Sequence, residues 1–157
     1  MRILMVCLGN ICRSPLAEGI MRKKIIEHNL PWTVDSAGTS GWHAGELPDS
    51  RTIQCAKNHD IDITNQRSRQ FKRSDFRNFD FIFVMDESNY NDIIMQAHTE
   101  DEAKKVHLLL SFADMIRTEV PDPFYGGLSS FESVFQLLDD ACNDVLEKLV
   151  NEQAAMN

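Results

Sequence analysis

Short apolar runs divide this 157-residue sequence into segments that predict four β-strands. The first run, residues 2–6, is almost entirely apolar, which is typical of a strand buried on both faces. Residues 79–85 carry the strongest strand signal, because three phenylalanines together with isoleucine, valine and methionine surround one aspartate. Shorter strands are predicted at residues 33–37 and 106–110.

Apolar residues between the predicted strands recur at intervals of three and four, the spacing of a helix with one buried face. The helices that this spacing predicts cover residues 15–29, 49–59, 86–98 and, most clearly, residue 129 onward. Ser14 suits the N-cap of the first helix, and Pro15 suits its first turn. Ser129 and Glu132 have the spacing of a capping box at the start of the last helix.

The alternation of strands and helices predicts an α/β fold. We expect a single three-layer domain over residues 1–157, in which helices cover both faces of a four-stranded parallel sheet. Two long loops, residues 38–48 and 111–127, interrupt the regular pattern and contain several glycines and prolines. No internal repeat or low-complexity segment indicates a second domain.

The net charge of −8 argues against nucleic acid as a partner, because a phosphate backbone binds to a basic face. A small anionic ligand is compatible with this net charge, because salt screens charges more than ~8 Å away. Whether an anion binds therefore depends on the residues of the loop that surrounds it. No apolar run approaches the ~20 residues that span a membrane, and no signal-peptide pattern is present. We therefore expect a cytoplasmic protein that does not associate with membranes.

Four irregularly spaced cysteines, Cys7, Cys12, Cys55 and Cys142, are typical of free or catalytic thiols rather than a disulfide framework. Cys55 and Cys142 fall on apolar helix faces, which indicates a structural role. No CxxC pair, HxxxH motif or carboxylate–histidine cluster indicates a metal site, so we expect neither a metal nor a cofactor.

The most informative segment is residues 7–15, Cys-Leu-Gly-Asn-Ile-Cys-Arg-Ser-Pro, between the first strand and the first helix. Ligands of α/β folds bind beyond the carboxyl ends of the strands, and a helix N-terminus there favours an anion and a thiolate. Arg13 adds a planar cation that can bind two phosphoryl oxygens, and Gly9 permits a tight turn. The segment therefore predicts a phosphate-binding loop in which Cys7 attacks phosphorus and forms a phosphocysteine intermediate.

The group that leaves phosphorus needs a proton, and Asp122 is the candidate donor. It lies in the segment Val-Pro-Asp-Pro-Phe-Tyr-Gly, where two prolines stiffen the backbone around one carboxylate. A carboxylate held in this way suits a general acid, which can afterwards act as a general base.

Three motifs, Cys7–Pro15, Ser36-Ala37-Gly38 and Asp122–Tyr125, resemble those of the low-molecular-weight protein tyrosine phosphatases. The chain length, the motif order and the alternation of strands and helices agree over nearly the whole sequence. The resemblance implies a sheet in the order 2-1-3-4, Cys7 as nucleophile, Arg13 as transition-state clamp and Asp122 as general acid and then base. It further implies hydrolysis of phosphotyrosine in proteins, and of small aryl phosphates, without a metal. Size and polarity are compatible with a monomer.

The resemblance also implies roles for residues around this centre. The positions that surround the phosphate or brace its loop are Leu8, Gly9, Asn10, Ile11, Cys12, Ser14 and Ser36. The aromatic side chains that select the substrate are Trp42, Phe124 and Tyr125, which offer flat walls to an aryl group. Cys12 is expected to trap oxidised Cys7 as a disulfide, and Asp86 is expected either to cap a helix or to lie near the loop.

Three other functions are weighed against this one. Protein-arginine phosphatases of the same family resemble Cys-Thr-Gly-Asn-Thr-Cys-Arg-Ser-Pro, with threonine where this chain has Ile11. An arsenate reductase on the same scaffold needs a further thiol pair, and residues 75–90 contain none. A phosphate-binding adaptor without turnover would lack Cys7, Arg13 or Asp122, yet all three are present.

Overall fold

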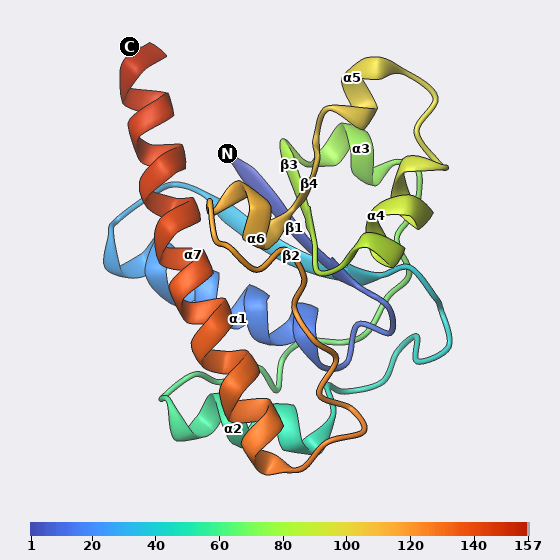
Figure 1. Cartoon of the computed structure of the whole chain (residues 1–157), viewed down its shortest axis with the longest axis vertical. Coiled ribbons are helices and arrows are strands. Elements are labelled where there is room, and N and C mark those ends of the chain that lie inside the picture. Colours follow the sequence, from blue (N-terminus) through green and yellow to red (C-terminus); the bar gives the residue numbers. More distant parts are fainter. Residues whose placement is uncertain (157) are drawn as a thin grey trace.

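The computed structural model describes residues 1–156. Its elements in chain order are β1 (Arg2–Cys7), α1 (Arg13–Glu27), β2 (Thr33–Gly38), α2 (Ser50–Asn58), α3 (Asp75–Asn78), β3 (Phe81–Val84), α4 (Glu87–Ile94), α5 (Glu100–Ala103), β4 (Val106–Leu108), α6 (Leu109–Phe112) and α7 (Leu128–Met156). The strands form one parallel sheet in the order β2-β1-β3-β4 (Figure 1). The predicted α/β fold and strand order are confirmed.

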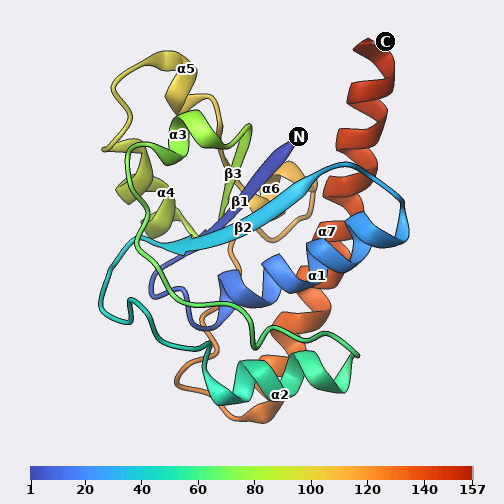
Figure 2. The same cartoon turned by 180° about the vertical axis from the view of Figure 1, so that it is seen from behind.

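Helices cover both faces of this sheet, and side chains of β1 alternate between the two layers. Ile3 and Met5 join a core cluster with α1 and α7, whereas Leu4 and Val6 join a second cluster with residues of α3 and α4. Figure 2 shows α1, α2 and α7 on one side of the sheet and α3 and α4 on the other. This explains the unbroken apolar run at the start of the sequence, because each face of β1 is buried.

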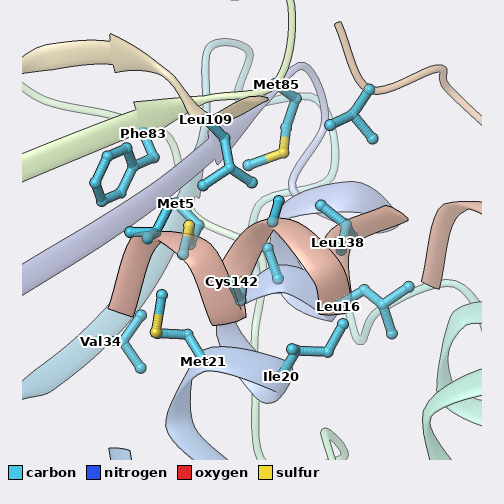
Figure 3. Packing of buried hydrophobic residues seen from close by; sticks show 14 of the residues in the cluster. Met5, Leu16, Ile20, Met21, Val34, Phe83, Met85, Leu109, Leu138 and Cys142 are labelled. Carbon is cyan, nitrogen blue, oxygen red and sulfur yellow. The ribbon is translucent and has the colours of Figure 1, made fainter. Parts of the chain in front are cut away.

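The larger of the two clusters fixes α1 and α7 on the sheet. Met5 and Met85 from the sheet side meet Leu16 of α1 and Leu138 of α7 (Figure 3). These side chains are at most 1% exposed, and burial of each contributes about 1.5–3 kcal/mol. The start of α1 is therefore held firmly under the carboxyl edge of the sheet, where β1 ends at Cys7.

A glycine brings the next strand close to the loop that follows β1. Gly38 ends β2, and a Cβ atom there would lie 2.7 Å from the carbonyl oxygen of Leu8 and 3.1 Å from the carbonyl carbon of Gly9. Any side chain at this position would displace the backbone of the loop. The end of β2 therefore supports the segment between β1 and α1.

The predicted N-cap of the first helix is wrong. Within residues 1–156, α1 begins at Arg13 with Cys12 at the N-cap position, and no side chain caps it. Ser14 lies inside the helix, and its hydroxyl contacts Cys7 instead. The hydroxyl of Ser14 therefore contacts the residue at the end of β1 rather than capping α1.

The predicted capping box of the last helix is also wrong. Helix α7 starts at Leu128, so Ser129 already lies within it. The carboxylate of Glu132 accepts hydrogen bonds from His59 at 2.9 Å and Gln136 at 3.0 Å. A tertiary contact with the end of α2 thus competes successfully with the local capping bond.

Several element ends differ from their predictions. The strand expected over 79–85 spans Phe81–Val84, because α3 precedes it and Phe79 is the C-cap of that helix. The strand expected over 106–110 ends at Leu108, where α6 starts at once. The helix expected over 86–98 ends at Ile94. No helix within residues 1–156 is long and apolar enough to cross a membrane.

Candidate active site

The sulfur of Cys7 lies at the carboxyl end of β1, where the chain turns into α1. Cys7 is 3% exposed, and its Sγ lies 3.0 Å from the hydroxyl of Ser14. Ser14 is in the first turn of α1, so a hydroxyl on the helix reaches back to the end of the strand. The thiol is thus placed at a helix N-terminus, next to a hydrogen-bonding group.

Asn10 braces the loop between Cys7 and Ser14. Its backbone has φ 56°, a left-handed conformation that asparagine tolerates better than most side chains. Its Nδ2 group donates to the hydroxyl of Ser14 at 2.8 Å and to that of Ser36 at 2.9 Å. Its Oδ1 atom accepts from the backbone N–H of Arg69 at 3.0 Å. Every polar atom of this buried amide therefore has a partner.

A carboxylate lies behind this network. The hydroxyl of Ser36 donates to Oε1 of Glu18 at 2.7 Å, and Oε2 of Glu18 pairs with Arg22 at 2.7 Å. Glu18 is only 3% exposed. Burial raises the pKa of Glu18, although the Ser36 hydrogen bond and the Arg22 charge partly oppose this shift.

The guanidinium of Arg13 is buried and oriented by two partners. Its Nη1 atom donates to Asp86 Oδ2 at 2.6 Å and to the carbonyl oxygen of Val120 at 3.1 Å. Burial would lower the pKa of Arg13, but the charges of Cys7, Asp86 and Asp122 raise it above its ordinary value. With Nη1 used in this way, Nε and Nη2 are the donors available for phosphoryl oxygens.

Asp86 connects this cation to the sheet and to α4. It follows β3, and its Oδ1 atom accepts from the backbone N–H of Asn89 at the start of α4. Its other oxygen binds Arg13. Asp86 therefore both caps a helix and lies beside the loop, which are the two alternatives that the sequence left open.

Asp122 approaches the same guanidinium from the long loop before α7. Its Oδ2 atom lies 3.7 Å from Arg13 Nη2, and its side chain is 38% exposed. Its Oδ1 atom accepts from the backbone N–H of Phe124 at 3.0 Å. The hydrogen bond within the loop therefore orients the carboxylate so that Oδ2 is the oxygen nearer to Arg13.

These groups share a hollow of about 160 Å³ at the surface. The residues that line it are Cys7, Leu8, Gly9, Ile11, Cys12, Arg13, Trp42, His43, Asp122, Phe124 and Tyr125. The structure therefore brings ten of the predicted site residues together in this hollow, and His43 is the one lining residue that the sequence did not predict.

The remaining predicted residues lie beneath the hollow rather than in its wall. Asn10, Ser14 and Ser36 are each at most 4% exposed. They contact one another and Cys7, as described above. The structure thus separates a buried layer that holds the loop from an outer layer that can touch a ligand.

The predicted substrate-selecting aromatics stand at the mouth of the hollow. Trp42 is 78% exposed and Tyr125 is 92% exposed, so neither belongs to the core. Phe124 packs edge-on against Tyr125, with ring centroids 5.0 Å apart. The guanidinium of Arg51 lies 5.4 Å from the ring centre of Phe124. These rings are available to contact a flat group bound above Cys7.

Sequence reasoning did not identify three residues that contact the site. His43 lies in the wall, with its ring against Gly9 and its Nδ1 atom 2.7 Å from Glu46. Glu18 follows Ser14 by four positions, so helical spacing could have placed both on one face. Arg69 contributes through its backbone N–H, for which no sequence signal exists.

All four cysteines are free and buried. Cys12 lies in the same hollow as Cys7, and burial raises its pKa to about 12. Burial also raises the pKa of Cys55 to about 11 and that of Cys142 to about 12. These three side chains are therefore protonated thiols at neutral pH. Across residues 1–156, no group of three or more His, Cys, Asp or Glu side chains is arranged to hold a metal ion.

Comparisons with known proteins agree with this geometry. A family model described as low molecular weight phosphotyrosine protein phosphatase matches residues 2–155. The human low molecular weight phosphotyrosine protein phosphatase is 42% identical over 149 residues, which cover 93% of this chain and 94% of the human protein.

Two solved structures have the same fold over almost their whole length. A protein tyrosine phosphatase from Entamoeba histolytica superimposes with a TM-score of 0.91 and 42% identity, covering 98% of this chain and 99% of that one. A Drosophila arginine phosphatase superimposes with a TM-score of 0.88 and 34% identity, covering 95% and 98%. Structures of this fold therefore include enzymes named for two different phosphorylated residues.

Proposed function

The chain belongs to the low molecular weight phosphotyrosine protein phosphatase family, and we propose that it hydrolyses phosphotyrosine in proteins through a phosphocysteine on Cys7. One observation carries the proposal: Cys7, Arg13 and Asp122 line a single hollow of about 160 Å³. A nucleophile, a fixed cation and a carboxylate are the three groups that hydrolysis of a phosphate monoester by this route requires.

In the first step, the thiolate of Cys7 attacks phosphorus as the bond to the tyrosine oxygen breaks. Nε and Nη2 of Arg13 bind two phosphoryl oxygens and stabilise the charge that spreads over them. Asp122 donates its proton to the departing phenolic oxygen through Oδ2, the oxygen nearer to Arg13. The products of this step are the dephosphorylated tyrosine side chain of the substrate and phosphocysteine.

In the second step, Asp122 accepts a proton from a water molecule that attacks the phosphocysteine. The sulfur leaves as a thiolate, and the hydroxyl of Ser14 at 3.0 Å is placed to donate to it. Inorganic phosphate is released, and Asp122 is again protonated for the next cycle. Asp122 thus donates a proton in the first step and accepts one in the second.

The walls of the hollow favour an aryl phosphate. Trp42 and Tyr125 present large exposed rings at its mouth, and Ile11 contributes an apolar side chain at the loop. A phosphoarginine substrate, suggested by the Drosophila neighbour, would place a charged guanidino group against these side chains. Arsenate reduction is disfavoured because Cys55 and Cys142 pack in the helices α2 and α7 rather than beside Cys7.

A substrate panel tests the proposal. Phosphotyrosine, phosphoserine and phosphoarginine peptides and small aryl phosphates are assayed with a chelator present. We expect phosphotyrosine and aryl phosphates to be hydrolysed much faster than the others. A preference for phosphoarginine would reassign the substrate, and binding of phosphate without turnover of any compound would indicate an adaptor.

We also propose that Cys12 protects the nucleophile during oxidation. Peroxide converts the Cys7 thiolate to a sulfenic acid, and the Cys12 thiol then displaces water and forms a disulfide. Both sulfurs line the same hollow. After peroxide treatment, mass spectrometry should find a Cys7–Cys12 bond, and thiol should restore activity. In Cys12→Ser, we expect thiol to restore a much smaller share of that variant's own untreated activity; equal recovery would contradict this role.

Finally, we propose that one chain is the complete catalytic unit. Every residue of the proposed site comes from this chain, including Asp122 from the loop before α7. Light scattering at assay concentration should give a mass near 18.0 kDa. Activity that rises more steeply than protein concentration would instead indicate an active oligomer.

A further inference from the structure

A buried carboxylate, Glu18, lies beneath the phosphate loop and has no part in the steps above. It belongs to α1, one turn after Ser14, and is 3% exposed. Buried carboxylates are uncommon unless their oxygens have specific partners. The partners of Glu18 lead, through hydrogen bonds alone, to the sulfur of Cys7.

The amide of Asn10 determines the direction of these hydrogen bonds. Its Oδ1 atom faces the backbone N–H of Arg69, which can only donate. The position of that N–H is itself fixed, because the neighbouring carbonyl of Arg69 accepts from Gly38 N at 2.8 Å. The Nδ2 group of Asn10 must therefore donate both of its hydrogens, one to Ser14 and one to Ser36.

The two hydroxyls that accept from Asn10 have one hydrogen each to donate elsewhere. Ser36 donates its hydrogen to Glu18 at 2.7 Å. Ser14 can then donate its hydrogen to the sulfur of Cys7 at 3.0 Å or to the carbonyl oxygen of Ala37 at 3.4 Å, and the contact with Cys7 is the shorter. A hydrogen bond donated to a thiolate stabilises the charged form of the sulfur.

Removal of Glu18 would make a different arrangement favourable. The hydroxyl of Ser36 would lose its acceptor in a buried place, which is costly for a polar group. Because the Arg69 N–H keeps the amide of Asn10 from turning over, the hydroxyl of Ser36 would reorient instead, and Asn10 would lose its contact with Ser36. With Asn10 held less firmly, the hydrogen of Ser14 could move from Cys7 to the carbonyl oxygen of Ala37, which lies 3.4 Å away.

We propose that Glu18 is a positioning residue, which holds the hydrogen of Ser14 on Cys7 by accepting the hydrogen of Ser36. The inference rests on the proposed function for its catalytic consequence, although the hydrogen-bond order can be tested without any substrate. Glu18 acts through Ser36, Asn10 and Ser14 and does not touch the phosphate.

The charges around Glu18 come from two elements. On α1, Arg22 pairs with Glu18 and also donates to the carbonyl oxygen of Val34; its side chain is 40% exposed. On β2, Asp35 is a nearby like charge, and it pairs with Arg69 at 3.2 Å. Because Arg22 reaches solvent, a neutral residue at position 18 need not leave a buried cation behind.

The pH dependence of Cys7 alkylation by iodoacetamide tests this arrangement directly. In Glu18→Met, which removes the acceptor at similar volume, we expect the midpoint pH to rise by about one unit, equivalent to a tenfold lower thiolate population. Glu18→Gln keeps an acceptor oxygen for Ser36, so its midpoint should move by less than half as much. Glu27→Gln, on the exposed part of α1, is the matched control and should leave the midpoint unchanged.

An unchanged midpoint in folded Glu18→Met would overturn the proposal, as would equal shifts in the Met and Gln variants. If Glu18→Met does not fold, Ser36→Ala takes its place, since it removes the hydroxyl that links Glu18 to Asn10. The midpoint should again rise, and no rise in the folded variant overturns the proposal. Where both variants fold, the double variant should show no more than the larger single shift, because the two residues act in series.

These outcomes are separate from the proposed function. If the unmodified protein hydrolyses phosphotyrosine but the midpoint of Glu18→Met stays the same, only the role of Glu18 fails. If the protein does not hydrolyse phosphotyrosine and the midpoint still shifts, the substrate assignment fails and the role of Glu18 stands.

Discussion

The two sides of the proposed active site are built very differently. On the loop side, Cys7, Asn10 and Ser14 are between 0% and 3% exposed and are joined by side-chain hydrogen bonds. On the opposite side, the carboxylate of Asp122 is 38% exposed and Tyr125 is 92% exposed. One side is part of the packed interior, whereas the other lies at the surface.

Val120 is one of the residues that attach the exposed side to the packed interior. Its backbone N–H donates to the carbonyl oxygen of Met85 at 2.8 Å, and its carbonyl accepts from Arg13. Val120 is 1% exposed, so this attachment is buried although the residues after it are not. Arg13 therefore contacts both sides of the site.

This difference follows from what each side must do. A thiolate and a bound dianion need donors that are already oriented, because reorienting them during the reaction would raise the barrier. A general acid must approach leaving groups of different size, and an aromatic wall must admit the substrate. The predictions below test this division, from the largest expected effect to the smallest.

Replacing the nucleophile should have the largest effect. We expect Cys7→Ser to lower kcat on the order of 10⁴-fold or more, because burial keeps Cys12, the other thiol in the hollow, protonated and a poor nucleophile. Phosphate or vanadate should still bind, which calorimetry can measure. Cys55→Ala, a change at another buried thiol, is the control. Undiminished hydrolysis by Cys7→Ser would exclude the phosphocysteine route.

Removing the carboxylate on the exposed side should have a smaller and selective effect. Asp122→Ala should lower kcat about 10²–10³-fold for phosphotyrosine, which is within the usual range for a general acid. The loss should shrink as the leaving group becomes more acidic, in a series of substituted aryl phosphates. Asp140→Ala on the exposed face of α7 is the control. An equal loss across the series would remove the acid role.

The contact between the two sides can be weakened at Asp86. Asp86→Asn removes the charge that orients Arg13 but retains a side chain able to cap α4. Loss of this charge-assisted hydrogen bond should lower kcat/KM about tenfold, corresponding to roughly 1.5 kcal/mol. Asp92→Asn, exposed on the same helix, is the control. A lower Tm with unchanged kcat/KM would show that Asp86 serves the fold alone.

Truncation of an aromatic wall should have the smallest effect. In Tyr125→Ala, kcat/KM for aryl phosphates should fall about two- to tenfold, because an aromatic contact is worth about 0.5–1.5 kcal/mol. Most of the change should appear in KM, since the ring binds the substrate and the transition state alike. Leu128→Ala, another exposed apolar residue nearby, is the control. An equal loss with an alkyl phosphate would argue against ring stacking.

Much of the fold could be predicted because its determinants are local. The apolar run of β1 and the three- and four-residue spacing in α1 and α7 each describe one element and its buried face. The short helices α3 and α6 were not predicted, because each has only four residues and lies against an end of a strand. The capping predictions failed where Ser14 and Glu132 found tertiary partners.

The sequence by itself determined the proposed phosphate loop, since residues 7–15 are contiguous and carry the proposed nucleophile, the cation and the start of a helix together. It also named Asp122 as a candidate acid, from its proline-flanked motif. Only the tertiary structure decided that Asp86 holds Arg13, that Ser36 connects Glu18 to Asn10, and that His43 lies in the wall. Those contacts join residues distant in the chain, and their geometry depends on how parallel strands align at one edge of the sheet.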